Sequence, residues 1–313
     1  MNFKKLFLPV GLVLAIICAL TIHQAGTWMK ENNFIPFFVI AIFLVSGWQF
    51  NVRDAKLNRK FIYTMLLAIV ISLFGAPFLG IGAVEIFNFG TLTATGLIVM
   101  CCVPVTLSSA TVITEMAHGN AVWSLLITVV MNLVGIFTIP LMLAFSLEEA
   151  EGVEISAWKL LYKLLILVLL PFIVGLVAKK VMKYKSKAFV AFIPSTCVIL
   201  TVYAASAASR ELLYKSTLRE ILLLTAVAFL IHIILMLVAL LGGKILKLET
   251  PELKALIFVS SQKTLPVSIS VLAILCDNPG MAIIPCLIFH FTQLFVDSVL
   301  ASHLAPKLKQ GGQ

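Results

Sequence analysis

The stretch FVSSQKTLPVS, residues 258–268, lies inside an apolar segment that is long enough to cross a membrane. It contains a lysine, a glutamine, several hydroxyl side chains and a proline. A charged side chain at the centre of a bilayer costs about 3 kcal/mol or more, so such residues usually face an interior cavity and mark function. The sequence therefore singles out Lys263 and its neighbours as a candidate site.

The composition of the whole chain is that of a polytopic membrane protein. Of its 313 residues, 61% are hydrophobic and only 12% are charged, whereas soluble proteins are nearer half apolar and a quarter charged. We count ten apolar segments of about the length that a bilayer requires. They cover roughly residues 5–24, 34–50, 61–80, 91–117, 121–145, 158–178, 188–208, 218–242, 252–275 and 279–301. We read the first as an uncleaved span rather than a signal peptide.

The positive charges indicate an orientation. Ten spans place both termini on the same side of the membrane. If the N-terminus is inside, the inner side carries 16 lysines and arginines and the outer side carries 6. Basic residues are retained in cytoplasmic loops, so we predict an inner or plasma membrane protein with both termini in the cytoplasm. The net charge of +9 then reflects orientation and not nucleic-acid binding.

A second stretch, VPVTLSSATV at residues 103–112, matches the first. Each has a Ser-Ser pair, a threonine and a proline near the middle of the fourth segment in a set of five. Because five is odd, the second set must run in the opposite direction. Interrupted helices in matching positions are typical of inverted-repeat transporters, with the binding site at their midplane. We predict an all-α protein whose two repeats are residues 1–150 and 151–313. The alternative is a pair of packing-driven kinks.

Broken helices expose backbone groups that need partners in hydrocarbon. If the fourth and ninth helices cross at their breaks, the N-terminal half-ends attract anions and the carbonyl ends attract cations. Hydroxyl ligands would come from Thr106, Ser108, Ser109, Thr111, Ser260, Ser261 and Thr264. Hydroxyl and carbonyl oxygens suffice for sodium. The alternative for any single hydroxyl is a bond to a carbonyl of its own helix.

Three roles are open for Lys263. It is a fixed cation that replaces a bound sodium ion, a partner for an anionic substrate, or, with a pKa lowered by burial, a proton carrier. The alternative is a salt bridge with a buried acid, for which Glu115 and Asp297 are the candidates.

Other polar residues carry less information. His290 and Gln293 share one helical face and are candidates for substrate contact, whereas His232 is read as a helix–helix hydrogen-bonding residue. The six cysteines lie in apolar segments without metal-type spacing, so we read them as small hydrophobic residues. There is no nucleophile-and-base motif, phosphate loop or zinc signature. We therefore expect no enzyme chemistry and no cofactor other than a coupling ion, Na⁺ or H⁺.

Four stretches resemble the sodium/bile-acid cotransporter family, and the similarity covers all ten segments. They are FLVSGWQF (43–50), VPVTLSSATVITEMAHGN (103–120), SSQKTLPVSI (260–269) and IPCLIFHFTQ (284–293). The chain is most similar to the divergent branch typified by the seventh member of solute carrier family 10. The resemblance implies ten helices in two inverted repeats, with segments 1, 2, 6 and 7 forming a panel and the others a core. It implies alternating access by movement of the core against the panel.

The resemblance also implies sodium sites, but this chain departs from them. For the first site it offers Ser109, Ser124 and Thr128. The acid shared by both sites is replaced by Phe258. For the second site, the glutamine of segment 9 remains as Gln262, and the residue after it is Lys263. The position on segment 3 that belongs to this site is occupied by Ser72. Two sodium ions beside an ammonium without a carboxylate would repel each other, so we do not expect two-sodium coupling.

These observations predict a secondary transporter of a small or amphipathic organic anion, in a cavity lined by side chains such as Phe38 and Trp48. The driving ion is left open between a proton, a single sodium ion and none. The alternative, suggested by the branch that the chain resembles, is a non-transporting membrane regulator of the calcium-homeostasis type on the same fold.

Overall fold

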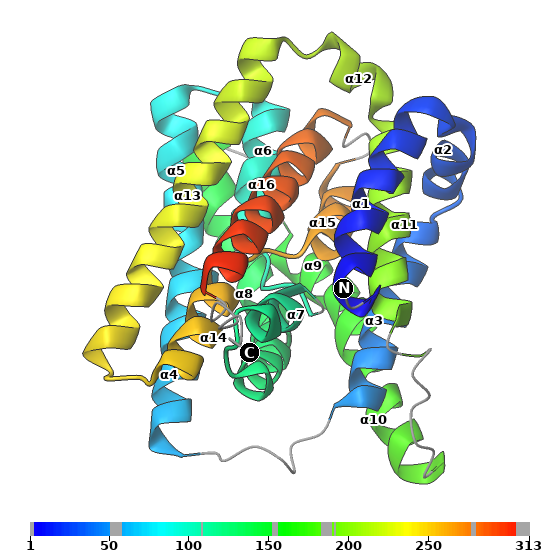
Figure 1. Cartoon of the computed structure of the whole chain (residues 1–313). Helices are drawn as coiled ribbons and strands as arrows, with labels where there is room; N and C mark the ends of the chain where they lie inside the picture. The colour runs from blue at the N-terminus through cyan, green and yellow to red at the C-terminus, as the bar shows by residue number, and fades with distance from the viewer. Residues whose placement is uncertain are drawn as a thin grey trace, which may run out of the picture.

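A computed structural model describes residues 3–50, 58–107, 109–151, 156–182, 190, 192–276 and 280–304. The elements of this described part are helices, as predicted (Figure 1). In the first half they are α1 (Phe3–Thr21), α2 (His23–Glu31), α3 (Phe34–Gln49), α4 (Arg59–Ile69), the π-helix η1 (Val70–Gly75), α5 (Ala76–Phe87), α6 (Thr91–Cys102), α7 (Ser109–Met116) and α8 (Ala121–Glu151). In the second half they are α9 (Ala157–Leu164), the π-helix η2 (Leu165–Leu169), α10 (Leu170–Met182), α11 (Ile193–Ala208), α12 (Arg210–Lys215), α13 (Leu218–Ile245), α14 (Thr250–Ser261), α15 (Leu265–Leu275) and α16 (Gly280–Leu304).

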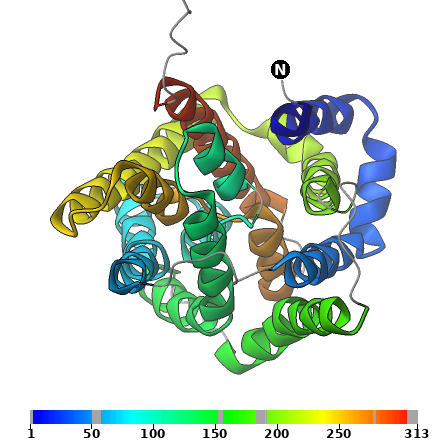
Figure 2. The ribbon, with the colours of Figure 1, turned by 60° about the horizontal axis from the view of Figure 1, so that its bottom comes forward.

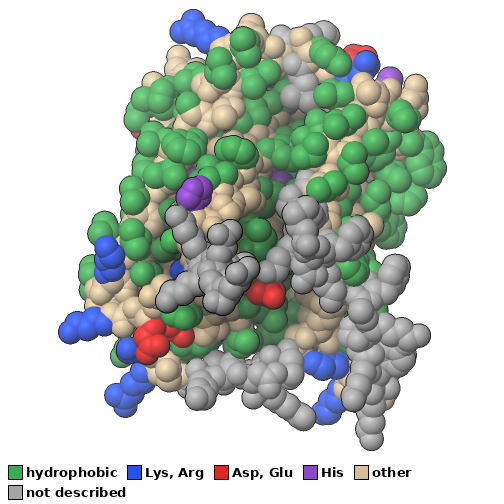
Figure 3. Space-filling model, viewed as in Figure 1, with side chains coloured by type: hydrophobic (Ala, Val, Ile, Leu, Met, Phe, Trp, Pro, Cys, Tyr) green, Lys and Arg blue, Asp and Glu red, His purple; other side chains and the backbone are tan. Residues whose placement is uncertain are grey.

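Several helices are long and apolar enough to cross a membrane. Among the described residues there are 6 such helices, or 7 if the pair α1 and α2, bent by 96°, forms one span. Three shorter apolar helices, α3, α6 and α11, add to these. Each of the ten predicted segments contains at least one helix, whereas their number as spans stays a prediction. Figure 3 shows hydrophobic side chains over most of one face, with Lys and Arg side chains gathered mainly toward its lower end.

Two connections between the predicted segments contain helix. Helix α8 continues to Glu151, beyond the predicted segment 121–145. Leucine, alanine and glutamate are good helix formers, and Leu147 is buried against the core. The connection between the first two segments contains α2, which packs on α11.

The helices pack as two groups. The panel group consists of α1, α2, α3, the α9–η2–α10 helix and α11, and the core group consists of the α4–η1–α5 helix, α6, α7, α8, α13, α14 and α16. Helix α15 contacts both groups, since it packs on α3 and α16, and the α9–η2–α10 helix does so as well, since it packs on α8 through α9 and η2 and on α3 through η2 and α10 (Figures 1 and 2). Within the panel group, α3 and α10 approach closely at Gly47 and Gly175. A methyl group on these residues would lie 2.1 Å from the oxygen of Phe172 and 2.0 Å from that of Leu44.

Prolines shape the two long helices that contain π-turns. In η1 the amide of Ala76 donates to the carbonyl of Ile71, five residues back, and the next residue is Pro77, which has no N–H. In η2 the amide of Leu170 donates to Leu165 in the same way. A π-turn shifts the hydrogen-bond register and releases a carbonyl for other partners. One such carbonyl, that of Ser72, belongs to the site described next.

Candidate functional site

The two polar stretches form two helix breaks that meet. Helix α6 ends at Cys102 and α7 begins at Ser109, while α14 ends at Ser261 and α15 begins at Leu265. The amide of Thr264 donates to the carbonyl of Pro104 at 2.9 Å. We call this meeting place, residues 103–107 and 262–264, the crossing.

Prolines explain why the helices stop there. Val103 precedes Pro104 and has an extended backbone, with ψ of 153°, because a residue before proline avoids the helical region. Pro266 has no N–H to donate to the carbonyl of Gln262, so a continuous helix would lose that bond, and it is instead placed in the first turn of α15. Each break is therefore encoded locally.

The ammonium group of Lys263 is enclosed by oxygen atoms. Its Nζ donates to the carbonyls of Ser72 at 2.6 Å, Cys101 at 2.9 Å and Val103 at 3.1 Å, and to the hydroxyl of Ser72 at 3.1 Å. The side chain is 0% exposed. We call these four oxygen atoms the oxygen cage. All of them are uncharged, so the ammonium occupies the kind of site that would suit a monovalent cation.

The cage follows from the local backbone. In a regular α-helix the amide of Ala76 would donate to the carbonyl of Ser72. Here it donates to the carbonyl of Ile71 instead, and the following residue, Pro77, has no amide hydrogen to offer. Cys101 and Val103 lie at the C-terminal end of α6, where carbonyls have no partners within the helix and the helix dipole is negative. Three unpaired carbonyls thus converge on a cation.

Two amide side chains bind backbone groups of the breaks. Gln293 accepts from the amide of Lys263 at 2.8 Å and donates to its carbonyl at 2.7 Å. Gln293 also lies 3.0 Å from Nδ1 of His290. Asn132 of α8 donates to the carbonyl of Val105 at 2.9 Å. Buried backbone groups need such partners, and the crossing supplies them from neighbouring helices.

A chain of buried polar side chains runs from the crossing to α13. Gln262 accepts from Oγ of Ser109 at 2.7 Å and donates to Oδ2 of Asp297 at 2.7 Å. The other oxygen of Asp297 lies 2.8 Å from Nε2 of His232, whose Nδ1 lies 3.2 Å from the carbonyl of Ser261. His232, Asp297 and Gln262 are each 0% exposed. The helix–helix role expected for His232 is thus observed.

The salt bridge considered for Lys263 is not observed. Asp297 is engaged by His232 and Gln262, and Glu115 is exposed near the end of α7. Among the described residues, the Lys263 ammonium has only the oxygen cage as its partners. Carbonyl oxygens take the place of the acid because the π-turn and the break of α6 leave them free.

The predicted hydroxyl ligands divide into several sets. Thr106 lies 3.4 Å from Oε1 of Gln262 and joins the crossing. Ser261 donates to Ile257 in its own helix at 3.0 Å, the local alternative. Ser124 accepts from Thr114 at 3.2 Å. In the described part of the chain, Thr111, Thr128 and Ser260 have buried hydroxyls without a partner, and Nε2 of His290 shares this property. Thr264 is buried in the second break, whereas Ser108 lies outside the described residues.

Three residues of the site were not among the predicted ligands. Asn132 is the single side-chain amide within its apolar segment, and the sequence alone could have identified it as a candidate on that ground. Asp297 and His232 are also intramembrane polar residues, but their pairing depends on the packing of α13 on α16. The space between the crossing and the panel group is a cavity of about 10 Å³. Its α3 wall is Val39, Ile42 and Phe43 rather than Phe38 and Trp48.

Comparison with known proteins gives a family for this geometry. The model of the SBF-like CPA transporter family matches residues 7–306. A rice protein named probable sodium/metabolite cotransporter BASS4, chloroplastic, is 28% identical over 95% of this chain and 74% of its own length. Putative symporter YfeH of Escherichia coli is 26% identical over 99% of this chain and 96% of its own. Sodium/bile acid cotransporter 7-B of Xenopus laevis is 23% identical over 96% and 91%.

The resemblance inferred from the four stretches is therefore confirmed, and with it a membrane transporter. The family and the apolar helices indicate an integral membrane protein, and the relatives point to transport rather than enzyme catalysis. The match spans nearly the whole chain, from within α1 to the end of α16. The chain belongs to the SBF-like CPA transporter family.

Proposed function

We propose that this protein is a secondary transporter of a small or amphipathic organic anion that works by alternating access. The observation that carries the proposal is the crossing, where two broken helices meet in a buried polar cluster beside the panel group. Broken helices at a midplane are the binding element of inverted-repeat transporters. The names of the relatives, sodium/metabolite and sodium/bile acid cotransporters, support the same class.

The proposed architecture is ten spans in two inverted repeats, residues 1–150 and 151–313, with both termini in the cytoplasm. Movement of the core group against the panel group would expose the crossing to each side in turn. The small volume at the crossing, about 10 Å³, corresponds to a closed conformation in this scheme. An open conformation must separate α3 from the crossing.

The anion is held by helix N-termini in this proposal. Helices α7 and α15 both begin at the crossing, at Ser109 and Leu265, and their positive ends favour an anion. The ammonium of Lys263 already binds carbonyl oxygens. It therefore contributes its charge through space and does not bind the substrate directly.

Lys263 also defines the ion coupling that we propose. Its ammonium occupies the oxygen cage as a fixed cation, so sodium does not bind there. A further cation close by would be repelled in the low dielectric of the core. Coupling is left to a proton, or to a single sodium ion near Ser109, Ser124 and Thr128, where Thr128 has a buried hydroxyl without a partner among the described residues.

Counterflow in liposomes tests the function. Purified protein is reconstituted with one unlabelled anion inside, and entry of labelled anion is followed with sodium or choline as the cation. Exchange of at least one carboxylate or sulfate supports a transporter. Absence of exchange with every anion of a broad panel contradicts it and favours a non-transporting regulator.

A further inference from the structure

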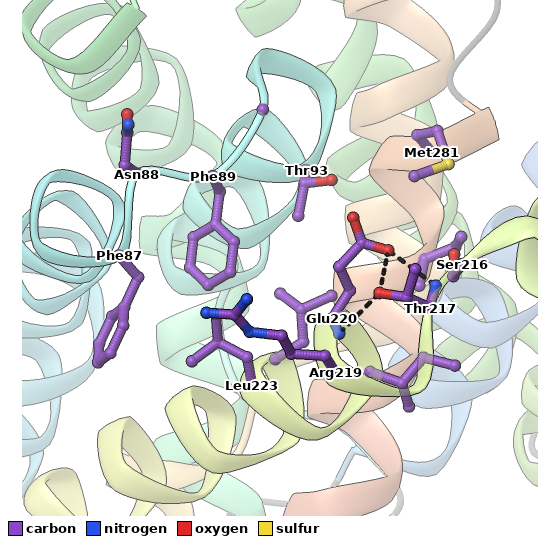
Figure 4. Close-up of a pocket in the computed structure, with 14 residues that line it drawn as sticks. Phe87, Asn88, Phe89, Thr93, Ser216, Thr217, Arg219, Glu220, Leu223 and Met281 are labelled. Carbon is purple, nitrogen blue, oxygen red and sulfur yellow. Dashed lines mark hydrogen bonds between the residues drawn. The ribbon is translucent and has the colours of Figure 1, made fainter.

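A second cavity lies away from the crossing, among helix ends of the core group. Its volume is about 470 Å³, far larger than the space at the crossing. Its walls come from the end of α5, the start of α6, the first turns of α13 and the start of α16 (Figure 4). The cavity does not include residues of the panel group, so it is separate from the proposed substrate path.

One side of this cavity is apolar and continues onto an apolar surface. Phe87, Phe89 and Leu223 line it (Figure 4). Ile86, which precedes Phe87 in the chain, is 75% exposed, and Leu218, in the first turn of α13, is 72% exposed. In an integral membrane protein such exposed side chains contact acyl chains. The cavity therefore opens next to lipid and near helix ends, where head groups lie.

The other side of the cavity carries one positive and one negative charge. Oε2 of Glu220 accepts from the amide of Thr217 at 2.8 Å and from its hydroxyl at 2.9 Å. Oε1 of Glu220 and the guanidinium of Arg219 have no hydrogen-bond partner among the described residues. Figure 4 shows the two groups reaching in different directions rather than toward each other. A cation and an anion are thus both available to a ligand.

We propose that this cavity binds a phospholipid whose head group carries a primary ammonium, such as phosphatidylethanolamine. The phosphate pairs with the guanidinium of Arg219, which suits phosphate oxygens. The ammonium group pairs with the free oxygen of Glu220, and an acyl chain lies over Phe87, Phe89 and Leu223. A neutral pair of protein charges complements a zwitterionic head group. In the proposed orientation this lipid belongs to the outer leaflet.

Native mass spectrometry of the delipidated full-length protein tests this site, with added phosphatidylethanolamine, phosphatidylcholine and phosphatidylglycerol of equal acyl chains. We expect retention of phosphatidylethanolamine above the other two. Arg219→Gln should lower retention about five-fold, the factor that corresponds to an exposed ion pair of about 1 kcal/mol. Arg59→Gln, an exposed arginine at the start of α4, is the matched control and should retain the lipid.

The variant Glu220→Gln provides a second, independent test of the proposed lipid site. Glutamine at this position preserves the capping box of α13, so the helix is kept while the charge is removed. The variant should lose the preference for phosphatidylethanolamine over phosphatidylcholine. Undiminished retention by Arg219→Gln, or equal retention of the three lipids by the unmodified protein, would overturn the proposal. Neither outcome depends on whether the protein transports an anion.

Discussion

Helix α14 and the break that follows it carry two lysines with similar bonds and different surroundings. Lys254, near the start of α14, donates to the carbonyls of Ala117 at 2.6 Å and Leu304 at 3.0 Å, and its side chain is 9% exposed. Lys263, just past the end of α14, donates to three carbonyls and one hydroxyl and is 0% exposed. Both ammonium groups bind backbone oxygens.

The difference lies in what surrounds those oxygens. Ala117 follows the end of α7 and Leu304 ends α16, so Lys254 caps two helix C-termini. Ala117 is buried, but Leu304 is partly exposed, so water can replace the lysine at its carbonyl. The carbonyls around Lys263 come from a π-turn and a helix break inside the core. Water is scarce there, and unsatisfied groups are costly. The same kind of hydrogen bond, from a lysine to backbone carbonyls, therefore caps helix ends at Lys254 and holds a buried cation in place at Lys263.

Replacement of Lys263 should have the largest effect. Lys263→Met keeps the length of the side chain and removes the ammonium, which leaves the oxygen cage unsatisfied. We expect a loss of about 3 kcal/mol in unfolding free energy and a fall of at least about ten-fold in anion exchange. Denaturation in detergent and counterflow in liposomes measure the two effects. Unchanged exchange by a stably folded Lys263→Met protein would remove the lysine from the mechanism.

Replacement of Gln293 should have the second-largest effect, because its side chain fixes the backbone of Lys263 through two hydrogen bonds. Lys254 lies in regular helix and needs no such support. Gln293→Leu should cost about 2 kcal/mol in unfolding free energy. Gln24→Leu, at an exposed position on α2, is the matched control. Equal denaturation midpoints for the two variants would show that the two hydrogen bonds of Gln293 do not stabilise the protein.

Asp297 connects Gln262 with His232 and should have a smaller effect. Asp297→Asn keeps the shape and one acceptor oxygen for Gln262, but it removes the negative charge and places an amide nitrogen, which cannot accept, opposite Nε2 of His232. One interhelical bond of this kind is worth about 1 kcal/mol. We expect a loss of that size in the same denaturation assay. A more stable variant would indicate that the buried carboxylate is a net cost to the fold.

The smallest effect is expected for Lys254. Lys254→Met removes a cap from two helix ends, of which the partly exposed one at Leu304 can turn to water, at a cost of about 0.5 kcal/mol. Anion exchange should stay within about two-fold of the unmodified protein, since the effect on stability is small. If Lys254→Met and Lys263→Met behave alike in both assays, the contrast between the two lysines is wrong.

The sequence predicted the two breaks because proline and hydroxyl residues interrupt apolar helices locally, and it singled out Lys263 as a charged residue inside an apolar segment. It did not predict the partners of Lys263. The free carbonyl of Ser72 depends on a π-turn, which periodicity does not reveal. Asp297, one of the two acids considered as an alternative partner of the lysine, pairs instead with His232 and Gln262. Which acid meets which base depends on the packing of α13, α14 and α16, and this is a tertiary property. The extension of α8 to Glu151 was missed because its residues are charged.

The central claim is that the Lys263 ammonium fills a cation site. Lys263→Ala empties the oxygen cage, whereas Lys254→Ala does not, and thermal unfolding of both is compared with the unmodified protein in sodium or choline chloride at equal ionic strength. A ligand that binds only the folded state raises its stability. We predict that sodium stabilises Lys263→Ala more than the other two proteins. An equal sodium effect on all three would contradict the claim.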